Sequence, residues 1–598
     1  MFTATNDPDP NSFPVEDPAH WPTYDNVTST FKKITFLANP GDFVYIHYSG
    51  HGIRKEPCYE FSNNSTGDLA LVLLDGKENV RYFWGPELAF LWKAMVEKGL
   101  VVTLVLDCCF SVSVYRRDDG IRCLPYDAEI DSKYPLYPEK SLEYISDGSA
   151  SRDANMLPNW LIKPDGYAML VACGPNEVAK GITSADGQRH GALSYFLLRT
   201  LRKCGGLQKN HKDLYRHLCA KFRESWPQQN PVLYGNKNQG FFGHIRSESD
   251  ITPVSIIERD GSLQLQAGQA HGICDGDQFF VCPLDSAEND SSSKCDLVIA
   301  KVNQSGVLTS DLELLGTTAI CVQTGWIAKP LTRFALRNIL IRLASELPHR
   351  DEFITTLKES SFNIHESMDE HLFSFHVVLN DKKEYEILDE SDQKIINLPT
   401  MSKDQTDASY ICDIIEHLAR YKIVKDLANN IPADPFQETF SAHIITSTGE
   451  CFGPECLAEV EQNEKAKFMF KLQVENKGNR NLYVQVYDMD PCWQVQDIYY
   501  GSYEVIPPQS SSRGFAKMTR KLKTIVPLEM REKGHRQCED TIKVFITSQP
   551  TSFDLLELPK LGKSINRNRI SRPSRGNGPG NLSEQWAALN FRIHTSLK

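Results

Sequence analysis

The amino-acid sequence predicts an α/β fold for its N-terminal part. Two β-rich and mostly apolar runs occupy residues 41–49 and 100–108, and an amphipathic helix is predicted between them at 86–98. Strand, helix and strand in this order form a βαβ unit, so the two strands are parallel and their crossover is right-handed. The apolar character of both runs is typical of strands that are covered on both faces.

The flanking elements follow in chain order. Apolar residues recur at three- and four-residue steps between positions 27 and 37, which predicts a helix that ends before a Pro-Gly pair. The second helix has Pro86 in its first turn and ends at Gly99. Residues 113–165 have no sustained period, so we expect a long exposed loop there. After this loop, we expect a strand at 167–173 and helices at 191–203 and 211–224.

The length of 598 residues corresponds to roughly three or four domains of about 150 residues each. Beyond residue 250 the pattern changes to short β-like runs with glycine turns, and runs with β-sandwich spacing follow from 434. The expected divisions are an irregular N-terminus (1–25), the α/β domain (26–248), a small β-domain (249–330), an α+β region (331–432), a β-sandwich-like domain (433–560) and a basic disordered tail (561–598).

The composition excludes several classes of protein. With 65 Lys and Arg against 77 Asp and Glu, the net charge of −12 argues against general binding to nucleic acid or to an anionic membrane. No apolar run approaches the ~20 residues that span a bilayer. The first residues lack a secretory signal, so we expect a cytoplasmic location in which the 16 cysteines are thiols. The basic tail is either solvated or a contact for an acidic partner.

Reactive side chains stand at the ends of both predicted parallel strands. Ser49 and His51 belong to the end of the first strand, and Asp107 and Cys109 to the end of the second. Sites form outside the carboxyl ends of parallel strands, so His51 and a cysteine can meet there. Because strand side chains alternate, Asp107 and Cys109 share one side and Cys108 points to the other. Cys109 is therefore the better candidate nucleophile.

This residue pair suits nucleophilic catalysis. The thiolate is the attacking species, and a neighbouring imidazole can activate the thiol and then protonate the leaving amine. The backbone amides of Gly52 and Cys109 could form an oxyanion hole. The alternative for each residue alone is a packing role at a strand end.

These motifs resemble those of the caspase-like cysteine peptidases, and more closely the metacaspase and fungal caspase-domain branch. The resemblance is carried by Y-S-G-H-G (48–52) and D-C-C-F-S (107–111), and by the downstream stretches YAMLVACGPNEVAKG, GQRHGALSYFLLRTL and QNPVLYGNKNQGFFG. It covers about residues 25–245. Residues 250–598 show only a loose likeness to β-rich modules that are appended to fungal caspase-domain proteins.

The resemblance implies a cysteine endopeptidase of protein or peptide substrates. Cys109 would be the nucleophile, His51 the general base and acid, and Ser49 and Asp107 the substrate-binding residues. A carboxylate in the specificity pocket pairs with Arg or Lys, so we expect cleavage after a basic residue.

The resemblance carries further expectations. The exposed loop offers Arg116, Arg117, Arg122 and Lys133, which are either solvated charges or self-cleavage positions. No cofactor is required. The resemblance implies calcium as the candidate metal, with the sparse acids Asp68 and Asp75 or Asp118 and Asp119 as its ligands.

The family domain begins with a strand, helix and strand ahead of the segment that matches 25–38. The sequence does not contain them, so we expect a sheet that is incomplete at the N-terminus. The alternative function is a catalytically impaired caspase-like scaffold whose C-terminal β-domains bind a protein partner.

Overall fold

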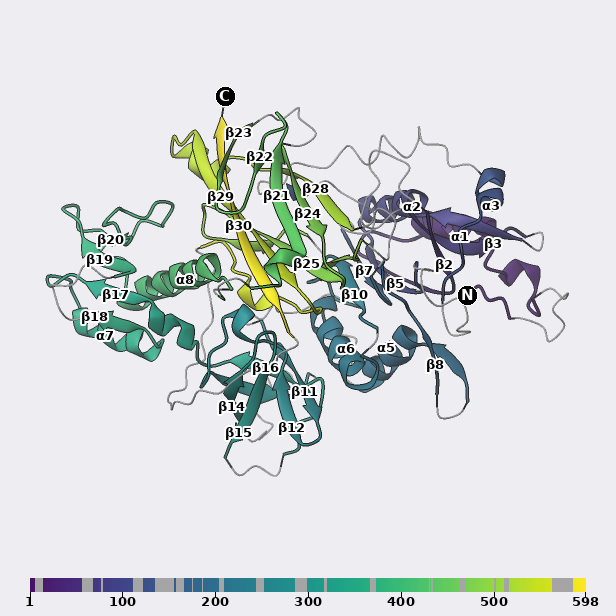
Figure 1. Cartoon of the computed structure of the whole chain (residues 1–598), viewed down its shortest axis with the longest axis horizontal. Coiled ribbons are helices and arrows are strands. Elements are labelled where there is room, and N and C mark those ends of the chain that lie inside the picture. Colours follow the sequence, from purple (N-terminus) through teal and green to yellow (C-terminus); the bar gives the residue numbers. More distant parts are fainter. Residues whose placement is uncertain are drawn as a thin grey trace.

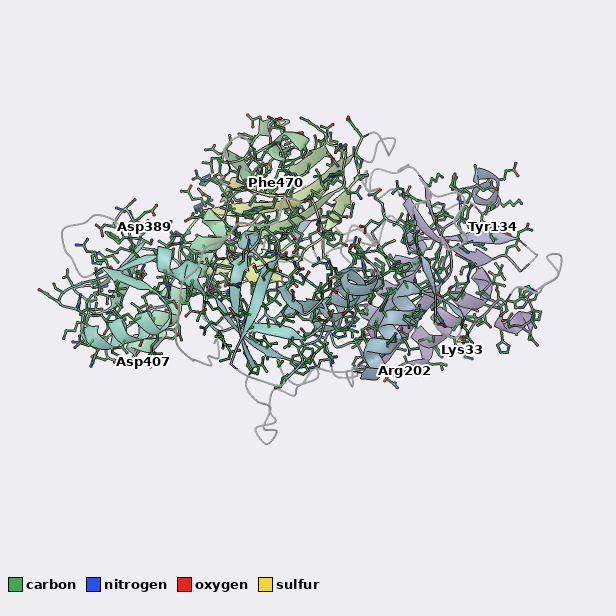
Figure 2. All side chains as sticks on the ribbon, turned by 60° about the horizontal axis from the view of Figure 1, so that its bottom comes forward. Lys33, Tyr134, Arg202, Asp389, Asp407 and Phe470 are labelled. Carbon is green, nitrogen blue, oxygen red and sulfur yellow. The ribbon has the colours of Figure 1, made fainter. Side chains whose placement is uncertain are left out.

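The computed structural model of the chain places an α/β unit at one end, a small α+β unit at the other, and a β-sandwich and a barrel between them (Figure 1). Figure 2 shows Asp389 and Asp407 on the α+β unit, Phe470 in the sandwich, and Lys33 at the far end. The structure describes all residues except 6–13, 56–67, 77–78, 111–121, 135–154, 157–165, 175, 185–186, 204–208, 228, 243–251, 285–297, 317–319, 366–372, 430, 432–433, 463–468, 500–501, 510–515, 562–583 and 598.

A four-stranded sheet organises the α/β unit. Three of its strands are parallel, and the fourth is antiparallel to its neighbour. The mixed α/β class predicted from the sequence is confirmed. The strands in sheet order are β1 (Phe43–Ser49), β5 (Val101–Asp107), β7 (Tyr167–Val171) and β10 (Val232–Gly235).

Helices cover both faces of this sheet. Leu104 of β5 packs in one apolar cluster with residues of α1 (Tyr24–Leu37) and α2 (Gly85–Glu97). Val105, the next residue, packs in another cluster with α5 (Ala192–Lys203) and α6 (His211–Ser225). Alternation along a doubly covered strand explains why β5 is apolar almost throughout.

Local signals set the ends of the first two helices. The Thr23 side chain accepts a hydrogen bond from the Asn26 amide at the start of α1, as an N-cap does. Lys98 donates to the carbonyl oxygens of Thr35 and Phe36 at the end of α1, where the last carbonyls lack helical partners. The Glu87 carboxylate accepts from the amide of Trp84 at the start of α2.

A three-stranded antiparallel sheet lies between β1 and α2, where no strands were predicted. It consists of β2 (Gly52–Lys55), β3 (Asp68–Leu74) and β4 (Val80–Trp84). The apolar runs LALVLL and VRYFW were available signals for it. The sheet has a role at the site, because the Val72 amide donates to the carbonyl oxygen of His51.

The segment predicted as a loop over 113–165 contains two short elements in its described part. Helix α3 (Ala128–Lys133) packs beside β4, and strand β6 (Asn155–Met156) joins a sheet of the distant sandwich. The loop prediction is therefore wrong for these residues.

Residues 254–330 form a closed six-stranded barrel. Its order is β11 (Val254–Arg259), β12 (Ser262–Leu265), β15 (Ser310–Leu315), β14 (Val298–Ser305), β13 (Gln278–Cys282) and β16 (Ile327–Pro330). A four-stranded α+β unit follows. It contains β18 (Asn363–His365), β17 (Leu340–Leu343), β19 (Phe375–Leu379) and β20 (Tyr385–Leu388), with α7 (Arg350–Glu359) and α8 (Ala408–Asp426).

Two sheets pack face to face in the sandwich, because Leu472 and Val544 share one apolar cluster. The first sheet contains β22 (Cys451–Phe452), β21 (Phe440–Thr446), β24 (Phe470–Asn476), β28 (Lys517–Lys523) and β6. The second contains β23 (Leu457–Gln462), β30 (Trp586–Leu597), β29 (Gln537–Thr547), β25 (Leu482–Met489) and β26 (Val495–Asp497), with β27 (Glu504–Ile506) paired to β25. Helix α9 is Leu528–Glu532.

The end of the chain is an ordered strand, so the prediction of a disordered tail over 561–598 is wrong for residues 584–597. Strand β30 lies inside its sheet, parallel to β23 and antiparallel to β29. Trp586 and Phe591 are buried in the sandwich. The segment 561–598 was interpreted as a whole, and the basic residues in its first half outweighed the apolar pattern of residues 586–597. No helix in the described part of the chain is long and apolar enough to cross a membrane.

A buried ion cluster joins the α/β unit to the C-terminal half. The Lys237 ammonium lies 2.7 Å from Asp497, 3.1 Å from Asp554 and 3.1 Å from Glu557. Arg216 of α6 also contacts Asp554, at 3.0 Å. The acids lie in the sandwich half and the bases in the α/β unit, so this cluster fixes the position of one relative to the other.

We expect Lys237→Met to destabilise the protein by about 3–5 kcal/mol, because it leaves buried carboxylates without their central cation. Urea unfolding of the full chain measures this loss. Lys33→Met is the control, because Lys33 is exposed on α1 and its loss should change stability by less than about 0.5 kcal/mol. Equal midpoints for the two variants would contradict a stabilising role of the cluster.

Candidate active site

The carboxyl ends of β1 and β5 lie side by side. Their register pairs Phe43 with Val101 and ends with Ser49 opposite Asp107. His51 and Cys109 each follow two residues later. The fold therefore brings all four predicted site residues to one rim of the sheet, which is where sites form in parallel sheets.

The two adjacent cysteines point to opposite sides of the sheet. Cys109 packs in the cluster that contains Ala192 and Leu193 of α5, whereas Cys108 packs in the cluster of α2. Both are fully buried. Burial, with the neighbouring Cys109 and Asp107, raises the pKa of the Cys108 thiol well above its usual value. Cys108 therefore remains a protonated core residue.

The predicted oxyanion-hole amides hold a carbonyl group of the chain itself. The carbonyl oxygen of Arg122 accepts hydrogen bonds from the Cys109 amide at 3.1 Å and from the Gly52 amide at 3.3 Å. The amide of Arg122 donates to the Ala179 carbonyl, and the amide of Leu124 donates to the Gly52 carbonyl. The segment 122–124 is thus bound in extended form across the rim, as a peptide substrate would be.

Gly52 allows this close approach. A Cβ at this position would lie 2.5 Å from the Cys109 carbonyl oxygen and 2.7 Å from the Phe110 ring. Both separations are far below van der Waals contact, so only a glycine fits at the start of β2 against the segment that follows β5.

The side chain of Arg122 enters the region of the predicted specificity residues. Its Nη2 donates to Ser49 Oγ at 2.6 Å. A Cβ at Gly191 would lie 2.0 Å from Asp107 Oδ2 and 2.6 Å from Arg122 Nη1, so carboxylate and guanidinium both lie against this glycine. Asp107 Oδ1 and Arg122 Nε are buried and make no hydrogen bond within the described structure. The Asp107 carboxylate and the Arg122 guanidinium therefore lie beside each other at the rim.

Ser194 and His47 are site residues that the sequence analysis missed. Asp107 Oδ2 accepts from the Ser194 amide at 2.8 Å and from Ser194 Oγ at 2.5 Å. Ser194 Oγ also lies 3.0 Å from His47 Nε2, and Tyr45 Oη lies 2.9 Å from His47 Nδ1. Ser194 lies inside the GALSY stretch, which was assigned only as a helix, and His47 is two residues before Ser49 on the same strand. These contacts orient the Asp107 carboxylate.

His51 is exposed at the rim and its backbone is fixed. Its carbonyl oxygen accepts from the Tyr48 hydroxyl at 2.7 Å and from the Val72 amide at 3.0 Å. The imidazole makes no hydrogen bond to a described side chain. Partial burial, followed by the positive charge of Arg122, lowers the pKa of His51 below 6.5.

The C-terminal sandwich supports one wall of the site. Asn176 and Glu177 lie just ahead of Ala179, whose carbonyl binds the Arg122 amide. Asn176 donates to the carbonyl of Val505, and Glu177 accepts from the hydroxyl of Tyr483, both in the sandwich. The loop that holds the substrate-like segment is therefore fixed by residues more than 300 positions away.

The described acids do not form an evident metal site. Within the described ranges, no group of three or more His, Cys, Asp or Glu side chains is arranged to hold a metal ion. Asp75 accepts from the Asn79 amide and lies 3.5 Å from the Tyr134 hydroxyl, while Asp68 is the first residue of β3. Asp118 and Asp119 lie outside the described residues, as do Arg116 and Arg117.

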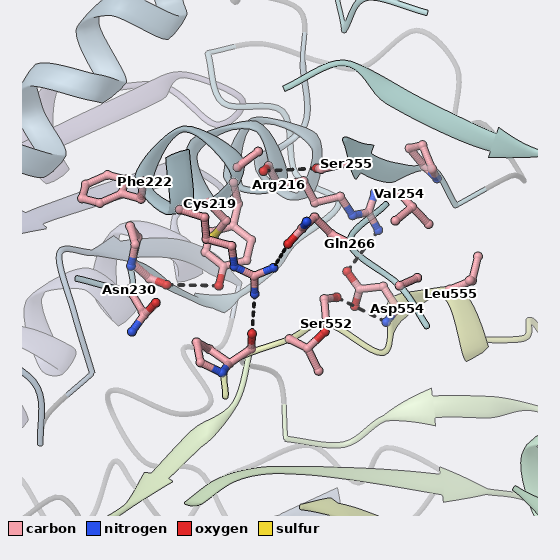
Figure 3. Close-up of a pocket in the computed structure, with 18 of the residues that line it drawn as sticks. Arg216, Cys219, Phe222, Asn230, Val254, Ser255, Gln266, Ser552, Asp554 and Leu555 are labelled. Carbon is pink, nitrogen blue, oxygen red and sulfur yellow. Dashed lines mark hydrogen bonds and ion pairs between the residues drawn. The ribbon is translucent and has the colours of Figure 1, made fainter. Parts of the chain in front are cut away.

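A separate cavity of about 70 Å³ lies where α6, the barrel and the sandwich meet (Figure 3). The Arg223 guanidinium hydrogen bonds to the Gln266 side chain and the Pro550 carbonyl across it. Figure 3 also shows Arg216 beside Asp554. None of the predicted catalytic residues lines this cavity.

Comparison with known proteins finds the following similarities. Residues 4–117 match the family profile described as metacaspase, peptidase C14 domain. Metacaspase III c of the diatom Phaeodactylum tricornutum is 28% identical over 118 residues, which span 19% of this chain and 35% of that protein. The solved structure of protein GSU0716 from Geobacter sulfurreducens covers 37% of this chain and 77% of its own, with 20% identity and a TM-score of 0.26. The family match includes both His51 and Cys109.

Proposed function

We propose that the chain is a cysteine endopeptidase that cleaves after arginine, with Cys109 as nucleophile and His51 as general base, because residues 4–117 match the metacaspase peptidase C14 profile. The observation that carries this proposal is the position of the Arg122–Cys123 peptide bond. Its carbonyl oxygen is bound by two amides beside a candidate nucleophile. The guanidinium of Arg122 donates to Ser49 and lies beside the carboxylate of Asp107.

The arrangement supports a conventional order of steps. The exposed imidazole of His51 turns toward Cys109 and removes the thiol proton, and the sulfur attacks the carbonyl carbon. The negative charge that develops on the oxygen is stabilised by the amides of Gly52 and Cys109. His51 then gives the proton to the leaving nitrogen, which breaks the peptide bond and leaves a thioester on Cys109. Water hydrolyses the thioester with His51 as base. Apart from this water, the steps use only groups of the chain.

The preference for arginine over lysine follows from the pocket. A guanidinium presents several donors in one plane, and here it reaches Ser49 while it lies beside the carboxylate of Asp107. The ammonium group of lysine is a compact point charge without the planar fork of donors. It can therefore satisfy fewer of these acceptors at once. We propose cleavage after lysine as the slower reaction.

Self-cleavage at the Arg122–Cys123 bond tests the proposal. The purified full chain is incubated in buffer with EDTA and in buffer with calcium, and the new termini are identified by mass spectrometry. We expect a new N-terminus at Cys123 in both buffers. Arg122→Gln should slow this cleavage at least about 100-fold, because the pocket loses its cationic ligand, whereas Arg122→Lys should retain part of it.

The possible outcomes separate the two functions. A chain that stays intact, folds normally and hydrolyses no arginyl peptide would favour the impaired scaffold, with Arg122 as a permanent plug. Cleavage only in calcium would show a metal requirement that the proposed steps do not contain.

The pH dependence follows from the lowered pKa of His51. The neutral imidazole is the base, so activity is lost as pH falls through the pKa of this group. Because burial and the Arg122 charge lower that pKa, we expect the acid limb of kcat/KM to have its midpoint below pH 6.5. Arg122→Gln removes the nearby charge and should move the midpoint upward. An acid midpoint above pH 6.5 in the unaltered chain would contradict the assignment of His51.

A further inference from the structure

Cys123, the residue directly after the bound arginine, contacts the candidate nucleophile. Its thiol is a hydrogen-bond partner of the Cys109 thiol. Cys109 is fully buried, while Cys123 is partly exposed. The pair therefore lies next to the peptide bond whose carbonyl oxygen is bound by the Gly52 and Cys109 amides.

The backbone places these two residues beside each other. The Cys109 amide is hydrogen bonded to the carbonyl of Arg122, and Cys123 forms a parallel bridge with Gly52. Arg122, the residue before Cys123, is therefore bonded directly to the backbone of Cys109. With Cys123 packed against the apolar cluster that contains Cys109, these neighbouring backbones suit a disulfide, which bridges Cα atoms about 4.4–6.8 Å apart.

We propose that Cys109 and Cys123 are an oxidation site that a hydroperoxide closes to a disulfide, which holds the uncut segment in the active site and blocks the nucleophile. This inference rests on the proposed function for its consequence, because Cys109 is the group that is blocked. The disulfide itself depends only on the contact between the two sulfurs.

The chemistry needs one oxidant, a hydroperoxide. The Cys109 sulfur attacks one peroxide oxygen, the O–O bond breaks, and Cys109 becomes a sulfenic acid while water or an alcohol leaves. The Cys123 sulfur then attacks the Cys109 sulfur, the S–O bond breaks, and the hydroxyl leaves as water with the Cys123 proton. The two thiols lose two hydrogen atoms, and the peroxide is reduced. A thiol reductant reverses the bond.

The contact geometry selects Cys123 over the other nearby thiols. Cys173 is buried and donates to the carbonyl oxygen of Glu177 at 3.4 Å. Cys108 lies on the opposite face of the sheet. Burial and the hydrogen bond to Cys109 are consistent with Cys123 keeping its proton, because that bond and then burial raise the pKa of its thiol. Cys123 is therefore the thiol in position to resolve an oxidised Cys109.

Peptide mapping of the full chain tests the oxidation site. The reduced protein is treated with hydrogen peroxide, remaining thiols are blocked with N-ethylmaleimide, and the chain is digested without reduction and analysed by mass spectrometry. We expect the Cys109–Cys123 cross-link as the main oxidised product, lost on treatment with dithiothreitol. In Cys123→Ser, Cys109 should instead proceed to the sulfinic acid, which dithiothreitol does not reverse. Cys173→Ser is the matched control and should keep the cross-link.

Mapping is repeated in His51→Ala, in which the proposed function predicts no cleavage, so the segment stays intact. A cross-link in His51→Ala, together with an inactive unaltered chain, would support the oxidation site and reject the peptidase. Cross-links from Cys109 to Cys173 or Cys108 would overturn the inference. So would sulfinic acid at Cys109 that forms as fast in the unaltered chain as in Cys123→Ser.

Discussion

Cys109→Ala is expected to abolish hydrolysis of an arginyl peptide, with a loss on the order of 10⁴-fold or more in kcat/KM. The substitution removes the only atom that the proposed mechanism uses to form the covalent intermediate, while the oxyanion amides and the acidic pocket remain. The measurement is steady-state hydrolysis of a short peptide that ends in arginine before a chromogenic leaving group. Self-cleavage at Arg122 should disappear in the same variant.

Cys108→Ala is the matched control for this experiment. The two cysteines are adjacent in sequence and both fully buried, but they face opposite sides of the sheet. Cys108→Ala removes a sulfur from the α2 side and should cost roughly 1 kcal/mol of stability with little change in kcat/KM. If Cys108→Ala eliminated activity and Cys109→Ala retained it, the assignment of the nucleophile would be wrong.

The meeting of the predicted site residues at one rim of the sheet could be predicted from the sequence, because it depends on local rules. Two apolar runs separated by a helix give parallel neighbours, and the two-residue period of a strand separates Cys108 from Cys109. The observed register, with Ser49 opposite Asp107, follows from the same rules. The resemblance to metacaspases is confirmed by the family match over residues 4–117.

The binding of Arg122 at this rim could not be predicted, because it depends on long-range contacts. Four basic residues of the loop were equivalent candidates in the sequence, and nothing local distinguishes Arg122. Its position is set by bonds to Gly52, Cys109 and Ala179, which lie 70 residues before it, 13 before it and 57 after it. The same holds for Ser194, which meets Asp107 only when α5 packs on the sheet.

The errors in the C-terminal half have a different physical origin. Strand β30 gains its stability from β23 and β29 on its two sides, and neither is near it in sequence. A short apolar pattern after a basic stretch therefore gives a weak local signal for a strand that tertiary pairing makes central. The sheet of β2, β3 and β4 was missed because the chain between β1 and α2 was treated only as a connection.

Asp107→Asn is expected to reduce kcat/KM for arginyl peptides by roughly 10²- to 10³-fold, which is about 3–4 kcal/mol. Asp107 has no exposed surface, so its charge is not screened by water. The amide is the same size and still accepts a hydrogen bond from the Ser194 amide, so the fold and the pocket shape should persist. What is lost is the negative charge beside the guanidinium.

A peptide with citrulline in place of arginine separates charge from shape in this variant. Citrulline keeps the planar side chain without its charge, so the unaltered chain should cleave it poorly, and Asp107→Asn should lose little further activity on it. Asp25→Asn, an exposed change on α1, is the control and should leave both substrates unaffected. Equal losses on arginine and citrulline would mean that Asp107 acts through the structure of the rim, by way of Ser194, and that the arginine preference has another source.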